Sequence, residues 1–200
     1  MRWYLLFLLS GCSVFQNSQL STNLNDATKN ICLSSVGKGR LQIASKKYIF
    51  SYESALNEEY GEWVLVLNFP LRPAETFKLD WSRDGAIVFE SSFDQKILRE
   101  NQNINPQNLD HFTQGLGKLI QEVIALRSGK SPSSEMKWKK IKNKLKVLNR
   151  GRKLKGEFSK LAASGHFGLM QLSFMGEGKS FYKLELVVRE CFDQNGKKLN

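Results

Sequence analysis

Large apolar side chains alternate with polar ones from about residue 37 to residue 89. This period-two pattern is typical of β-strands that bury one face. The dipeptide Asp84-Gly85 stands between two alternating runs, which is a strong hairpin signal. We therefore expect a meander of five antiparallel strands. Their apolar centres are Leu41–Ile43, Tyr48–Tyr52, Trp63–Phe69, Phe77–Trp81 and Ile87–Phe89.

The pattern then changes to helical spacing. Asn105 suits the cap of a helix and Pro106 its first position. Apolar residues recur every three or four positions from there to about Arg127, which predicts one long helix with an apolar face. Towards the end of the chain, alternation over residues 169–174 and 182–188 predicts two more strands around a Gly176-Glu177-Gly178 turn.

The segment between the helix and these last strands is ambiguous. Residues 138–148 fit a helical stripe of apolar residues, and they also fit a strand in which lysines alternate with apolar residues. Asn149-Arg150-Gly151 has the composition of a turn, and alternation resumes from Leu154. We favour a hairpin.

These elements predict a mainly β (α+β) fold, in which a curved, unclosed antiparallel sheet is covered by one or more helices. Such a half-closed barrel can enclose an acyl chain. The same apolar residues can instead form a filled core, and the pattern alone leaves both readings open. The residues expected to line the concavity are Leu41, Phe50, Leu65, Leu67, Phe77, Leu79, Phe112, Leu116 and Ile120.

The first residues have the layout of a secretory signal peptide. Arg2 precedes a short apolar run, and Leu9-Ser10-Gly11-Cys12 looks like the lipobox at which bacterial lipoproteins are cleaved and lipidated on cysteine. The apolar run is too short to cross a bilayer, which takes about 20 residues. We expect residues 1–11 to be a signal peptide, Cys12 to carry the lipid, and the polar residues 12–36 to form a flexible tether, with a short helix at the end of its polar part (residues 13–31) left open.

Two cysteines remain once Cys12 is lipidated, Cys32 and Cys191. An exported chain meets an oxidising compartment, which favours a disulfide, although two buried thiols are an equal alternative. The bond requires the first and last strands to be neighbours. We place the folded domain at residues 37–192 and a tail at residues 193–200.

The net charge of +11 is concentrated in one segment. Residues 137–160 hold eleven Lys or Arg and one acid, Glu157. This basic patch could face lipid phosphates, or it could be the solvated face of a hairpin; nucleic acid is an unsuitable partner for an exported protein. Its candidate residues are Lys139, Lys140, Lys142, Lys144, Lys146, Arg150 and Arg152.

Sequence signals for catalysis are weak. His111 and His166 have no metal-ligand spacing, the carboxylates form no acid–base pair, and phosphate-loop, dinucleotide and nucleophile-elbow motifs are missing from the sequence. We expect neither an enzyme nor a protein that needs a metal or cofactor.

The first half of the chain resembles LolB, the outer-membrane lipoprotein receptor of the Lol pathway, and its relatives. The similar stretches are Gly39–Ile43, Lys46–Phe50, Val64–Leu71 and Glu75–Leu79. The resemblance covers residues 37–127 and does not extend to residues 132–165. It implies an unclosed barrel that takes acyl chains of lipoproteins from a periplasmic carrier and releases the cargo into the outer membrane. It also implies that Leu71, on a loop between prolines, touches the bilayer.

The expected function is therefore that of a monomeric lipoprotein, anchored in the outer membrane and facing the periplasm, that receives or inserts other lipoproteins. Ser13 after Cys12 fits this location, because an aspartate there keeps many lipoproteins in the inner membrane. The alternative is a structural or interaction lipoprotein whose basic face contacts anionic lipid, lipopolysaccharide or a partner.

Overall fold

A computed structural model describes residues 24–43, 45–71, 74–80, 88–91, 106–149, 151, 153–175, 181–193 and 195–199. It is dominated by one antiparallel sheet of eleven strands, in the order β5-β4-β3-β2-β1-β10-β9-β8-β7-β6, with β11 paired to β10. The sheet has two ends, β5 and β6, that do not pair with each other in this order. The expected mainly β fold with a curved, unclosed sheet and a covering helix is thus confirmed.

The sheet consists of two meanders that meet in its middle. The first contains β1 (Ser34–Ile43), β2 (Lys46–Asn57), β3 (Glu62–Asn68), β4 (Glu75–Asp80) and β5 (Val88–Ser91). The second contains β6 (Met136–Ile141), β7 (Lys144–Asn149), β8 (Leu154–Leu161), β9 (Phe167–Met175), β10 (Phe181–Phe192) and β11 (Lys198–Leu199). The first strand pairs with the tenth along most of its length, from Ser34↔Phe192 to Ile43↔Tyr182.

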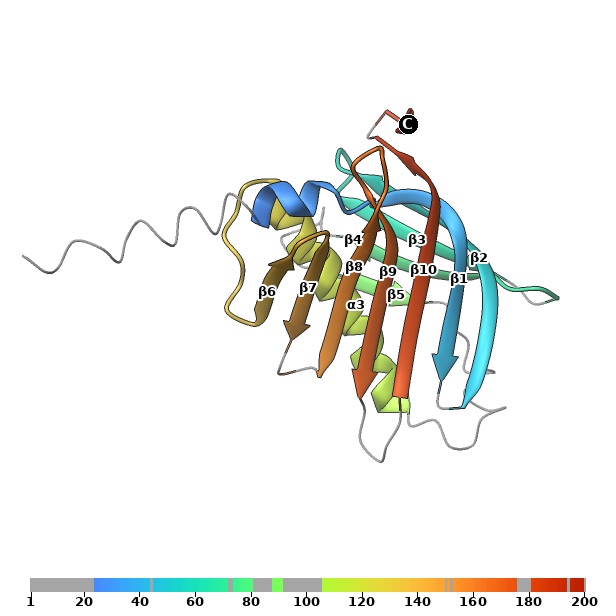
Figure 1. Cartoon of the computed structure of the whole chain (residues 1–200). Coiled ribbons are helices and arrows are strands. Elements are labelled where there is room, and N and C mark those ends of the chain that lie inside the picture. Colours follow the sequence, from blue (N-terminus) through green and yellow to red (C-terminus); the bar gives the residue numbers. More distant parts are fainter. Residues whose placement is uncertain are drawn as a thin grey trace, which may run out of the picture.

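One long helix, α3 (Pro106–Arg127), connects the two meanders and lies inside the curve of the sheet. In Figure 1 strands β7 to β9 pass in front of α3, β1 and β2 continue the sheet to the right of it, and β3, β4 and β5 lie behind. Contacts reach the helix from the second meander, where Phe112 stacks on Tyr182 with ring centroids 5.9 Å apart. The sheet therefore wraps around the apolar side of α3. This packing removes the apolar face of the helix and the apolar inner face of the sheet from water.

The expected strands and the long helix are present with small shifts at their ends, except that Asp84-Gly85, Asn105 and Gly176–Gly178 lie outside the described residues. The hairpin favoured for the basic segment is also present, with one turn more than expected. Lys142 and Asn143 connect β6 to β7, and Lys142 has a positive φ of 49°. The turn after Asn149 then connects β7 to β8.

The short helix allowed for at the end of the tether is present at residues 24–29, and β1 begins at Ser34 rather than at Gly37. The flexibility expected for residues 24–36 is wrong, because this segment packs on the main core. Leu24 and Ala27 are buried there on one face of the short helix, and Ile31 is buried just after it. The expected tail is also partly structured, since β11 pairs with the end of β10. Residues 12–23 lie outside the described part of the chain.

Two buried glycines in β1 let the sheet bend closely over its own aromatic residues. Gly39 lies opposite Phe50 and Gly37 opposite Tyr52 on β2. A Cβ added at either glycine would overlap the facing aromatic ring, as well as a β10 backbone oxygen in the case of Gly37. The Gly37-Lys38-Gly39 sequence is therefore explained by close packing inside a strand.

Candidate functional sites

The nine residues expected to line a concavity all point to the inner side of the sheet. Each is at most 3% exposed, and all belong to a single buried cluster with α3 at its centre. Side chains fill this space. The described void that touches it, beside Ile120, Trp63 and Phe158, has a volume of about 20 Å³. That is room for about one water molecule. The filled-core reading therefore describes this part of the structure, with α3 in the place where an acyl chain would lie.

Helix α3 is the main apolar occupant of the concave face. Its inward-facing side chains are 0–2% exposed: Phe112, Leu116, Leu119, Ile120, Val123 and Leu126. Opposite them, the Tyr182 hydroxyl is buried without a hydrogen-bond partner among the described residues, and burial raises the pKa of this phenol. The lining is thus almost wholly apolar, which suits hydrocarbon.

Leu71 has a different environment from every core leucine. It lies in the β3–β4 loop next to Pro70, is 105% exposed, and adopts a φ of 61°. The left-handed conformation costs a leucine about 1–2 kcal/mol, and this side chain recovers nothing by burial. The exposure expected for Leu71 is therefore observed, and packing does not explain why a leucine occupies this position.

The basic residues divide between two faces of the β6–β7 hairpin and its turn. Lys139, Lys144 and Lys146 lie in outward-facing register positions, Lys140 pairs with the inward-facing Leu145, and Lys142 is in the turn. Arg150 and Arg152 lie outside the described residues. The residues predicted for the basic patch therefore do not all lie on one surface.

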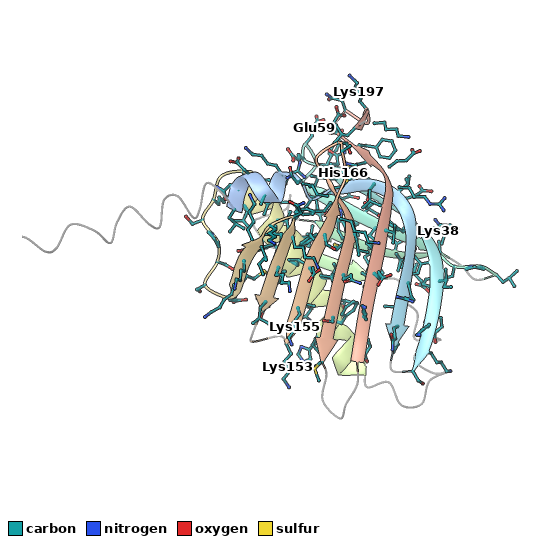
Figure 2. The ribbon with its side chains drawn as sticks, in the orientation of Figure 1. Lys38, Glu59, Lys153, Lys155, His166 and Lys197 are labelled. Atoms are coloured by element: carbon teal, nitrogen blue, oxygen red, sulfur yellow. A yellow bond between two sulfur atoms is a disulfide. The ribbon has the colours of Figure 1, made fainter. Side chains whose placement is uncertain are left out.

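Three further lysines complete this surface, of which Lys137 and Lys155 belong to the basic segment 137–160 without being candidate residues, and Lys183 lies outside it. Lys137, Lys155 and Lys183 come from β6, β8 and β10, and strand register places them in one row. A groove of about 710 Å³ lies along that row on the outer side of the sheet. Figure 2 shows Lys155 towards the end of the sheet opposite His166 and Lys197. Simple alternation marks each of these lysines as outward-facing, but only the register shows that they are neighbours.

The predicted link between Cys32 and Cys191 is present in the structure, where the two residues form a disulfide with Cα atoms 5.8 Å apart. Two hydrogen bonds fix the segment beside it. Trp63 Nε1 donates to the Leu33 carbonyl over 3.0 Å, and the Phe167 amide donates to the Asn30 carbonyl over 2.8 Å. The bond therefore joins the N-terminal segment to the last long strand at one end of the core.

The remaining chemistry is limited. Within the described ranges, His, Cys, Asp and Glu form no group of three that could hold a metal ion. His166 Nδ1 lies 2.8 Å from the Ser164 hydroxyl, and burial lowers the pKa of this imidazole. No described helix has the length and apolar character that spanning a bilayer requires. Cys12 lies outside the described residues, so its lipidation stays a prediction.

This chain matches no protein-family model and no curated protein sequence.

Proposed function

We propose that this protein is a lipid-anchored, periplasm-facing lipoprotein of the outer membrane, which binds acyl chains and helps to receive or insert other lipoproteins there. The observation that carries this proposal is Leu71, a fully exposed leucine held in a conformation unfavourable for leucine. An apolar side chain presented in this way is suited to entering a bilayer. The sequence resemblance and the lipobox at Cys12 support the same function.

In the proposed mechanism the acyl chain replaces α3 in the concave face of the sheet. Burial of the six inward-facing α3 side chains contributes on the order of 9–18 kcal/mol. A sixteen-carbon chain gains about 13 kcal/mol when all its methylenes leave water. The two amounts are similar, so the exchange of helix for hydrocarbon is close to balanced. Neither the state with α3 in place nor the state with the acyl chain in place is then strongly favoured, as uptake followed by release of cargo requires.

Delivery also requires contact with the membrane, which the proposal assigns to Leu71. The test is transfer of a lipidated protein from its soluble periplasmic carrier to liposomes. The Leu71→Glu change should reduce transfer at least about tenfold, because a carboxylate at the bilayer centre costs about 2.5–3.5 kcal/mol. The free energy of unfolding should change by no more than about 0.5 kcal/mol, since the residue is exposed.

Tyr60→Glu is the matched control. Tyr60 is 64% exposed in the β2–β3 turn, so the substitution adds the same charge at another exposed position that holds a large hydrophobic side chain. It should transfer cargo as the wild type does. If Leu71→Glu also transfers cargo at the wild-type rate, the protein is a passive binding module and the insertion role is rejected.

A further inference from the structure

The outer face of the second meander carries two parallel rows of side chains that cross the strands. One row is Lys137, Leu148, Lys155, Ser173 and Lys183, and the other is Lys139, Lys146, Glu157, Gln171 and Glu185. The groove of about 710 Å³ lies between these rows and is lined by all of these residues except Glu185. We call it the outer trough. The face of strands β7 to β9 that is turned away from α3 is the one towards the viewer in Figure 1.

The trough is strongly cationic after its internal ion pairs are considered. Glu157 lies 2.8 Å from Lys144 Nζ and 3.4 Å from Lys146 Nζ, and the hydrogen bond from Lys144 lowers the pKa of this carboxyl. Lys183 is 3.7 Å from Glu185. Lys137, Lys139 and Lys155 have no acidic partner in the described part of the chain. Three ammonium groups are therefore free to bind an anion.

Protection of a sheet edge does not account for this arrangement. Lysines on an edge strand such as β6 discourage pairing with another chain, which explains Lys137 and Lys139. Lys155 and Lys183 lie on β8 and β10, which are paired on both sides. They extend the positive charge across the interior of the sheet, and half-buried Leu148 lies between the two groups. The trough thus carries lysines along its whole length, with one apolar side chain, Leu148, between the lysines of β6 and those of β8.

We infer that the outer trough binds the headgroup of an anionic membrane lipid that carries two phosphates. Neighbouring strands are about 4.8 Å apart, so lysines on β6 are about 10 Å from those on β8 and about 19 Å from those on β10. Two phosphates separated by a pair of sugar rings fit this spacing, and the ring faces can pack on Leu148. Ammonium groups bind phosphate as point charges and need no strict angle. The inference rests on the proposed function for the protein's place at a membrane.

The test measures vesicle binding by the whole chain with Cys12→Ala, which removes the lipid. One set of phosphatidylcholine vesicles contains a glucosamine disaccharide lipid with two phosphates. A second set contains its monophosphate form at a mole fraction that matches the total phosphate charge. We expect at least fivefold tighter binding to the bisphosphate vesicles. Equal binding to the two sets would reduce the trough to a general cationic face and overturn the inference.

Two triple variants test whether the trough lysines are responsible for binding to the bisphosphate vesicles. Lys137→Gln/Lys139→Gln/Lys155→Gln removes the free lysines of the trough, and Lys46→Gln/Lys130→Gln/Lys197→Gln removes three exposed lysines elsewhere. Both lower the net charge equally, and both should match the parent in thermal unfolding. The trough variant should bind bisphosphate vesicles at least about tenfold more weakly, and the control no more than about twofold. Equal losses would overturn the inference.

The outcomes separate this inference from the proposed function. Single-stranded DNA is a competing polyanion, and preferential binding of DNA over bisphosphate vesicles by the trough lysines would overturn the lipid assignment. Cargo transfer by the Leu71→Glu protein is a separate measurement, and it tests the β3–β4 loop and not the trough. A failed trough test leaves the Leu71 result standing, and a failed Leu71 test leaves a lipid-binding surface on a protein that does not insert cargo.

Discussion

At the scale of single residues, Leu71 differs from the other residues that share its backbone conformation. Four non-glycine residues in the described part of the chain have a positive φ, and the other three are Lys142, Lys153 and Lys160. Lys142 and Lys153 lie in turns and Lys160 lies in β8, and all three are exposed, so each keeps its charge in water and costs little beyond the backbone strain. Leucine in the same conformation adds exposed hydrocarbon to that strain. A function outside folding is therefore the simplest physical reason for leucine at this position.

A second residue-scale feature, the pairing of Gly39 with Phe50, gives a direct test of the close packing in β1. The Gly39→Ala substitution puts a methyl group into the buried Phe50 ring and should lower the free energy of unfolding by about 1–3 kcal/mol. Gly151→Ala is the control, because the nearest atom to its Cβ would be 3.8 Å away. Urea unfolding measures both. A Gly39→Ala protein as stable as the control would mean that the Phe50 ring moves aside freely.

At the scale of elements, the central issue is whether α3 leaves the sheet. A Cβ on Gly115 would lie 3.8 Å from Leu154 Cγ, so these two positions are the pair at which an engineered disulfide between the helix and β8 can be tried. The oxidised Gly115→Cys/Leu154→Cys protein should bind a fluorescent palmitate analogue at least about tenfold more weakly than the wild type, since the helix then blocks the concave face.

Reduction should restore binding in the double variant. The wild type under the same reductant controls for loss of the Cys32–Cys191 bond, and each single cysteine variant controls for altered packing. If the oxidised double variant binds the analogue as well as the wild type does, acyl chains do not occupy the space taken by α3.

The elements also show what sequence patterns could and could not predict. Strands such as Trp63–Phe69 and the helix to Arg127 were predictable, because large apolar residues repeat with one clear period. A short helix at the end of the tether could be suggested from the sequence, but its burial in the core could not, because the helix is short and only its buried face is apolar. The outer trough could not be predicted, since Lys137 and Lys183 fall in one row only through the register of the strands between them.

At the scale of the whole molecule, the disulfide closes a very long loop. Cys32 and Cys191 are separated by 159 positions, and the chain-entropy model gives such a loop about 5 kcal/mol of stabilisation. Removal of native disulfides commonly costs about 2–5 kcal/mol. The Cys32→Ala/Cys191→Ala protein should lose an amount in this range in urea unfolding, and wild type under reductant should lose the same. A loss below about 1 kcal/mol would show that the hydrogen bonds at Leu33 and Asn30 suffice to hold the segment.

The pairing of β1 with β10 has a consequence for the order in which the molecule folds. The first meander can form by local contacts, but one edge of β1 has no partner until β10 has been made. Contacts over such sequence distances form slowly, because the closure of a long loop precedes any gain from pairing. During this interval the chain presents an open strand edge, and such edges recruit other chains. The partly folded protein is therefore most prone to aggregation just before β10 pairs with β1, and the seam at the centre of the sheet is the last part of it to close.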